Sequence, residues 1–319
     1  MRLISTAFLF LLLAPAAPWA QQPPKEEEPT SIKVDVDVVN ILCSVRDKKG
    51  ALLGNLSKDD FALFEDGKPQ EIKYFARETD LPLTIGLLVD VSGSQARLIQ
   101  EERQAAYQFF SQVLRKKDMA FLISFGPEAE LLQDFTNSPR LLQTALDGLR
   151  VSSAVGGLHP GPVPTASQQR GTVLYDAVYL AASDRLQKEV GRKAIVLITD
   201  GMDFGSRVKK EGAIEAAQKA DSMIYSIYYV DQAVYGGFGM GASDSDLKRM
   251  SEETGGRLFH VGRKNTLSEI FRQLQEEMRS QYAIGFTSSN ERKDGGFRKL
   301  EIRTKDKNLK VQARKGYYK

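Results

Sequence analysis

Alternation between apolar runs of strand length and amphipathic helical stretches, from residue 81 to residue 279, limits the fold of this chain more than any other feature. The run LPLTIGLLVD at residues 81–90 is almost continuously apolar, which is typical of a strand buried on both faces of a parallel sheet. Further strands and helices follow in turn. We therefore expect an α/β fold, an open and mostly parallel doubly wound sheet with helices on both faces.

The predicted elements of this part follow from apolar runs and helical periodicity. The expected strands are 81–90, 119–125, 129–135, 194–200, 223–230 and 257–261, and the expected helices are 98–113, 140–149, 172–186, 211–220, 243–253 and 267–278. We take residues 81–279 as one domain.

The flanking residues have a period of two instead. In the N-terminal block, 31–80, valines alternate with acidic residues and then change parity after Val38, which predicts a strand with a bulge. Ser57 and Asp60 predict the cap of a single helical turn, and Asp66-Gly67 predicts a hairpin between strands near 61–64 and 72–75. The C-terminal block, 280–319, predicts three more strands, at 282–286, 300–302 and 309–313. Because each block is small for a sheet domain, we expect the two to form one composite, β-sandwich-like domain.

The chain begins with an apolar run too short to span a bilayer, followed by small residues and prolines. This predicts a signal peptide over residues 1–20 and a polar, Pro-rich linker over 21–30. No later stretch is apolar for long enough to cross a membrane, so we expect an exported protein, periplasmic or secreted, without a transmembrane segment in the mature chain.

The net charge of +3 is too small to indicate a nucleic-acid partner. Residues 290–319 hold eleven basic and four acidic residues, and a solvated polar sheet face accounts for them more simply than an anionic partner does. The single cysteine, Cys43, cannot form an internal disulfide and is expected to be a small apolar strand residue.

Carboxylates and hydroxyls collect at the ends of the predicted strands. They are Asp90, Ser92 and Ser94 after the first strand, Thr172 before a helix, and Asp200 after the strand 194–200. In open α/β sheets, ligands bind outside the carboxyl ends of the strands, where the winding direction reverses. All five side chains are hard oxygen ligands without a matching Cys or His set, which favours Mg²⁺ or Mn²⁺ over Zn²⁺.

The motifs DVSGS, GT-x-LYDA and TDG resemble the three parts of the metal-ion-dependent adhesion site of von Willebrand factor A (VWA) domains, which is similar in integrin I domains. The resemblance covers residues 81–279, and the flanking blocks resemble bacterial exported VWFA-related proteins. It implies that Asp90, Ser92, Ser94, Thr172 and Asp200 form the metal site. It also implies non-catalytic adhesion, in which an Asp or Glu of a protein ligand completes the coordination of the metal.

Plainer roles compete for these residues. Ser92 and Ser94 can cap a helix, and Asp200 can begin a turn. For Asp203, the role of a turn residue is favoured over that of a metal ligand. Asp176 is expected to lie in the first turn of its helix. The possible rim for a protein ligand comprises Asp203, Tyr235, Phe238 and Met240, and the Gly- and Pro-rich loop 151–171 should border it.

Enzyme interpretations have less support. The turn DVSGSQ is not GxGxxG, a GK[ST] phosphate loop is absent, Ser92 is not in GxSxG, and the only histidines are His159 and His260. We therefore expect a non-enzyme. Metal-dependent hydrolysis or phosphoryl transfer, and a structural or assembly factor with a non-binding site, remain the alternatives.

Overall fold

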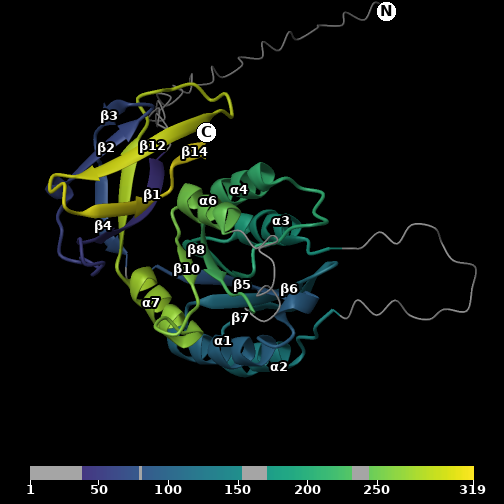
Figure 1. Ribbon diagram of the computed structural model, residues 1–319. Helices are drawn as coiled ribbons and strands as arrows, with labels where there is room; N and C mark the ends of the chain where they lie inside the picture. Colours follow the sequence, from purple (N-terminus) through teal and green to yellow (C-terminus); the bar gives the residue numbers. More distant parts are fainter. Residues whose placement is uncertain (1–37, 79–80, 153–170, 232–243) are drawn as a thin grey trace, which may run out of the picture. The chain divides into compact units, whose positions relative to one another are not determined.

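The computed structural model describes residues 38–78, 81–152, 171–231 and 244–319, all within one compact unit, Asp37–Lys319 (Figure 1). These residues form one six-stranded sheet and two four-stranded sheets. None of the described helices is long and apolar enough to cross a lipid bilayer. The predicted signal peptide and linker lie outside the described residues and stay predictions.

The six-stranded sheet has the order β10-β9-β8-β5-β6-β7. Its strands are β5 (Leu83–Asp90), β6 (Met119–Phe125), β7 (Ala129–Thr136), β8 (Arg192–Thr199), β9 (Ser222–Tyr228) and β10 (Leu258–His260). All neighbours are parallel except β6 and β7, which are antiparallel. The winding direction reverses between β5 and β8, so the expected doubly wound sheet is confirmed.

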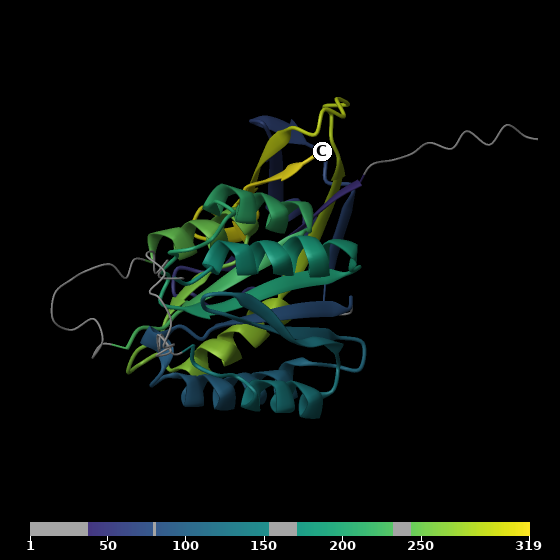
Figure 2. The ribbon, with the colours of Figure 1, turned by 90° about the vertical axis from the view of Figure 1, so that its right-hand side faces the viewer.

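Helices cover both faces of this sheet (Figures 1 and 2). They are α1 (Ile99–Val113), α2 (Pro139–Asp147) and α7 (Leu267–Arg279) on one face, and α3 (Leu174–Tyr179), α4 (Lys210–Lys219) and α6 (Ser245–Thr254) on the other. Every residue of β5 is buried, because alternate side chains enter the two cores. Gly86 lets the strand pack against Phe121, since a Cβ there would lie 2.3 Å from the ring.

The predicted helix 172–186 begins and ends two residues later than expected and is less regular. The α-helix begins at Leu174, changes to a π-helix at Leu180–Arg185 and ends in a 3₁₀ turn at Leu186–Lys188. The Ser183 hydroxyl donates to the Tyr179 carbonyl at 2.6 Å and so competes for a helical acceptor. Thr172 therefore lies before the helix, in extended chain.

Strands from the two ends of the chain pair with each other. One sheet has the order β13-β1-β11-β4, with β13 (Lys310–Ala313), β1 (Val38–Arg46), β11 (Gln281–Thr287) and β4 (Tyr74–Glu78). The other has the order β14-β12-β2-β3, with β14 (Gly316–Tyr318), β12 (Phe297–Thr304), β2 (Phe61–Glu65) and β3 (Lys68–Gln70). Both sheets contribute to one apolar core, which includes Cys43, and burial raises the pKa of its thiol to about 12.

Three details of the end blocks differ from expectation. The hairpin turn at Asp66-Gly67, with φ of 49° and 79°, joins β2 to β3, and the strand expected at 72–75 instead belongs to β4 in the other sheet. Strand β14 was not predicted. The β1–β11 register is continuous from Val38, so the described residues contain no bulge there, and the residues before it lie outside the described part. The helical turn Lys58–Asp60 has the expected Ser57 and Asp60 capping box.

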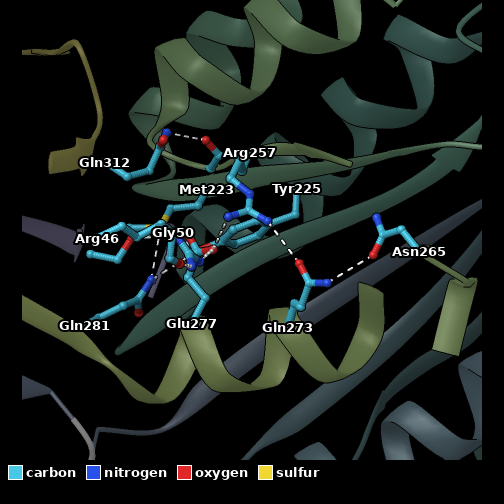
Figure 3. A network of polar contacts seen from close by, with 12 residues as sticks. Arg46, Gly50, Met223, Tyr225, Arg257, Asn265, Gln273, Glu277, Gln281 and Gln312 are labelled. Carbon is cyan, nitrogen blue, oxygen red and sulfur yellow. Dashed lines mark hydrogen bonds and ion pairs between the residues drawn. The ribbon is translucent and has the colours of Figure 1, made fainter. Parts of the chain in front are cut away.

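A buried polar network connects the end strands to the α/β part (Figure 3). Glu277 of α7 has no exposed surface and accepts from Arg46 of β1 at 2.5 Å and from the Ser44 hydroxyl at 3.3 Å. Arg257 lies 4.0 Å from the same carboxylate. Tyr225 and Gln281 complete the network, so three elements far apart in the sequence meet around one acid.

Candidate metal centre

The candidate site lies at the carboxyl ends of β5 and β8, which are hydrogen-bonded neighbours in the sheet. Asp90 is the last residue of β5, and Asp200 follows the last residue of β8. This is also the point where the winding direction reverses, which is the expected place for a ligand in such a sheet. The fold therefore brings together two carboxylates from distant parts of the sequence.

Asp90 is fully buried and fixed by two donors. The Ser92 backbone N–H donates to its Oδ1 at 2.9 Å, and the Thr199 hydroxyl donates to its Oδ2 at 2.6 Å. Burial, and then the nearby charge of Asp200, raise the pKa of Asp90 to about 6, against the lowering effect of these hydrogen bonds. Removal of the carboxylate from water is thus the main cause of the shift, and repulsion by Asp200 adds to it.

Two serines connect the end of β5 to the end of β8 through hydrogen bonds. Ser92 Oγ and Ser94 Oγ lie 2.9 Å apart, and Ser94 Oγ donates to Asp200 Oδ2 at 2.5 Å. Ser92 occupies the N-cap position of the 3₁₀ turn Gly93–Gln95, but its side chain makes no capping bond. The plain capping role therefore does not account for its hydroxyl, whose contact is with Ser94.

Thr172 is joined to this edge through its backbone. It is buried, and its carbonyl accepts from the Phe204 N–H at 3.0 Å, which ties it to the loop after Asp200. Within the described residues its hydroxyl makes no hydrogen bond to the other four side chains. Its place in the metal set therefore rests on the sequence resemblance.

The other acidic residues nearby have local contacts. Asp203 Oδ1 accepts from the Ser206 hydroxyl at 2.5 Å and the Tyr175 N–H at 3.3 Å. Asp176 accepts from the Val208 N–H at 2.8 Å. Both hold the loop after β8 against the start of α3. Asp203 as a ligand rim stays a prediction, and Tyr235, Phe238 and Met240 lie outside the described residues.

The donor set fits a hard divalent cation. Every side-chain atom offered is a carboxylate or hydroxyl oxygen, which is the chemistry that Mg²⁺ and Mn²⁺ take. Across the described part of the chain, no three His, Cys, Asp or Glu side chains converge as a metal-holding group. A cation here would therefore be held by two carboxylates and by neutral hydroxyls, whose oxygens are hard ligands.

Two features near the site were missed from the sequence. Glu102 of α1 is fully buried, and the available signal was an acid on the helix face that also carries Ala105, Ala106 and Phe109. Phe204 is 65% exposed beside a cavity of about 840 Å³ that Gly171 and Val173 also line. No periodic signal marks Phe204, because it lies in a loop.

Comparison with known proteins gives distant structural likenesses only. No protein-family model matches the chain, and no curated protein matches it. Proximal thread matrix protein 1 from the mussel byssus is similar at 16% identity and a TM-score of 0.49, over 67% of this chain and 51% of that one. The vWF domain of the pilus tip protein Mfa5 from Porphyromonas gingivalis is similar at 12% identity and a TM-score of 0.43, over 62% and 95% of the two chains.

A further likeness is to the BatB protein of Bacteroides thetaiotaomicron, at 18% identity and a TM-score of 0.41, over 62% of this chain and 97% of that one. The mussel protein also has a structure with a zinc-occupied MIDAS motif. This chain spans about half the length of the mussel protein. These identities are too low to transfer a function. The six-stranded mixed sheet with flanking helices, together with two further sheets, is an α/β fold with additional β blocks.

Proposed function

We propose that this chain is an exported, non-catalytic binding protein whose VWA-like domain binds Mg²⁺ or Mn²⁺ and, through it, a protein partner. Asp90, Ser92, Ser94, Thr172 and Asp200 would hold the cation. The cation would supply a Lewis-acidic, positively charged point at the protein surface. An Asp or Glu carboxylate of the partner is the natural group to complete its coordination, because a carboxylate is the kind of hard oxygen ligand that Mg²⁺ and Mn²⁺ take.

The observation that carries this proposal is the unbroken contact between the two strand ends. Asp90 is fixed by Thr199, and Asp200 is reached by Ser94, which is itself 2.9 Å from Ser92. A set of oxygens that is already positioned loses little conformational freedom when a cation binds. The chain's own contribution is thus to orient its hydroxyls and to bring the two carboxylates close together.

Features around the site support a protein as the partner. Phe204 is exposed, and the cavity beside it is bordered by Gly171, the residue before Thr172. An exposed aromatic side chain next to a cation site can contact the residues that flank a partner's carboxylate. Export is supported by the predicted signal peptide and by the absence of a membrane-spanning helix among the described residues.

The metal site is tested by calorimetric titration with Mn²⁺. Losing a residue that orients metal ligands typically lowers metal affinity ~10- to 100-fold, so we expect at least this loss in Asp90→Ala, Asp200→Ala and Ser92→Ala. Asp134→Ala is the matched control, because Asp134 is an exposed strand carboxylate paired with Arg185. Wild-type affinity in all three site variants would mean that these residues are only turns and caps.

The binding role is tested by capture of proteins from envelope and secreted fractions, with Mg²⁺ and again with chelator. Capture that requires Mg²⁺ and is lost in Asp200→Ala supports the proposal. Metal-independent capture would instead favour a structural or assembly factor. Turnover of a phosphoester that depends on the same residues would favour the hydrolytic alternative.

A further inference from the structure

Glu102 is an acid on the apolar face of α1. The buried residues of this helix are Ile99, Glu102, Ala105, Ala106, Phe109, Phe110 and Val113. Its neighbour Glu101 is exposed and accepts from the Tyr229 hydroxyl at 2.5 Å. Two adjacent glutamates in the first turn of one helix therefore have opposite environments. The proposed function makes no use of either.

Glu102 is exceptional among the buried carboxylates of the described residues, which are Glu65, Asp90, Glu102, Asp118, Asp200 and Glu277. The other five all accept hydrogen bonds, as Glu65 does from Ser288 and Tyr317, and Asp118 from two backbone N–H groups. Both oxygens of Glu102 are buried and have no hydrogen-bond partner among the described residues. Such a group needs an explanation, because buried polar groups are nearly always paired.

Neither protonation state explains Glu102 by itself. A charged carboxylate buried without a donor is strongly unfavourable, and a neutral carboxyl would bury an O–H without an acceptor. The positive end of the α1 dipole favours acids in this turn, but that effect is far smaller than the cost of burying an unpaired charge. The dipole accounts for the exposed Glu101 and not for Glu102.

Glu102 lies near the candidate metal centre, close enough for its carboxyl group to feel the charges of the two aspartates. Helix α1 follows the Ser92–Ser94 turn, and Glu102 experiences the charges of Asp90, Glu101 and Asp200, which add to burial in raising its pKa. The Oε1 of Gln95, the residue after Ser94, is also buried without a partner. Glu102 and Gln95 Oε1 are thus two buried acceptors without a donor among the described residues, which is an environment that a nearby cation would balance.

We infer that Glu102 is an inner carboxylate of the metal centre, a positioning residue that strengthens cation binding through its charge near Asp90 without coordinating the metal. This inference rests on the proposed function. Glu102 acts through its charge, because no three acidic side chains of the described residues converge on one point. A cation held by Asp90 and Asp200 would supply positive charge near Glu102, whose carboxylate has no donor among the described residues.

The test compares wild type, Glu102→Gln and Glu101→Gln in the full chain, by Mn²⁺ titration and by thermal unfolding in Mn²⁺ and in chelator. We expect Glu102→Gln to lower Mn²⁺ affinity about 10-fold, as loss of a residue behind the metal ligands typically does. Its melting temperature in chelator should equal or exceed that of wild type, because the unpaired acid is gone. Its stabilisation by Mn²⁺ should shrink. Glu101→Gln, with the same change of charge one residue away, should retain wild-type affinity.

The outcomes separate the two proposals. If wild type does not bind Mn²⁺, both the metal centre and the inner carboxylate are overturned. If wild type binds but Glu102→Gln has the same affinity and the same metal-induced shift in melting temperature, only the role of Glu102 is overturned. Equal losses in Glu101→Gln would overturn it as well. If Glu102→Gln does not unfold cooperatively, Glu102→Met replaces it, with the same loss of Mn²⁺ affinity expected.

Discussion

Buried acids at two places in this protein differ in how their charge is balanced. One place is the contact between the end strands and the α/β part, here called the joint, which is the polar network around Glu277. There Glu277 is fully buried and lies 2.5 Å from Arg46 and 4.0 Å from Arg257. At the carboxyl ends of β5 and β8, Asp90 is equally buried, and no arginine or lysine of the described residues pairs with it or with Glu102. The chain supplies the counter-charge of Glu277 itself, and we propose that a bound cation supplies it for Asp90 and Glu102.

This difference is the one expected between an acid that stabilises the fold and an acid that binds a cation, which is the role proposed for Asp90. Charges taken out of water are tolerated only when a partner is close and hydrogen-bonded. Around Glu277 the partners come from β1 and from the residues before β10, so the charge is balanced whenever the protein is folded (Figure 3). Around Asp90 the raised pKa records an imbalance that persists after folding.

The largest effect on the free energy of unfolding is expected when Glu277, the acid paired with arginines, is removed. Glu277→Ala leaves Arg46 and Arg257 facing each other without their acid, and removing one member of a buried pair typically costs ~3–5 kcal/mol. We expect a loss of this size in the free energy of unfolding, measured by denaturant titration. Glu276→Ala is the matched control, because Glu276 is 53% exposed and pairs only with Arg272 at the surface. A loss below that of the control would show that the joint does not depend on this acid.

The unbalanced site should make metal-free protein less stable at higher pH. The pKa of Asp90 is about 6 in the folded protein, above its unfolded value of 3.8, so the folded state holds the proton more tightly. The stabilisation is complete below the unfolded pKa and is lost as pH rises to the folded pKa. Two pKa units correspond to about 3 kcal/mol. In chelator, stability should fall by about this amount from pH 4 to pH 6.5, and Asp90→Asn should lack this part of the slope.

The same pH series in Mn²⁺ should be flatter, because a cation balances the ionised Asp90 at neutral pH. Equal slopes for wild type and Asp90→Asn in chelator would contradict the assignment. Equal slopes with and without Mn²⁺ would show that the cation does not bind at Asp90.

The smallest effect on the free energy of unfolding is expected for Glu277→Ala in a chain that lacks the two end blocks. We propose that residues 81–279 form a domain separate from the two end blocks, 31–80 and 280–319. A shortened chain of residues 81–279 lacks Arg46 and leaves Glu277 without its cover from β1. Glu277→Ala should then change the free energy of unfolding by no more than about 1 kcal/mol, the value typical of exposed ion pairs. A shortened chain without α-helical circular dichroism would refute the proposed boundaries.

Local patterns predicted the central elements well and the end strands less well. The buried strands 81–90 and 119–125 agree with β5 and β6 to within two residues, because continuous apolar runs are a strong signal. The turn at Asp66-Gly67 was found, but its second strand was not, since β3 has only three residues and little apolar character. Strand β14 is equally short, and its pairing with β12 depends on the sheet rather than on its own sequence.

For the candidate site, the sequence placed Asp90, Ser92, Ser94 and Asp200 at one sheet edge, because carboxyl ends of parallel strands meet there. It could not show that Glu102 lacks a partner, since that depends on every side chain packed against α1. The role of Asp203 was left open, and its bonds to Ser206 and Tyr175 belong to a loop contact that no pattern marks.

The sequence by itself determined the alternation of strands and helices, the oxygen ligands at the strand ends and the two-residue period of the end blocks, because these depend on neighbours a few residues apart. Only the tertiary structure decided which buried acids are balanced. Arg46 reaches Glu277 across 231 residues of sequence, and Thr199 reaches Asp90 across 109. Charge balance is a property of what folding brings within a few ångströms, and local periodicity carries no information about partners so distant in the chain.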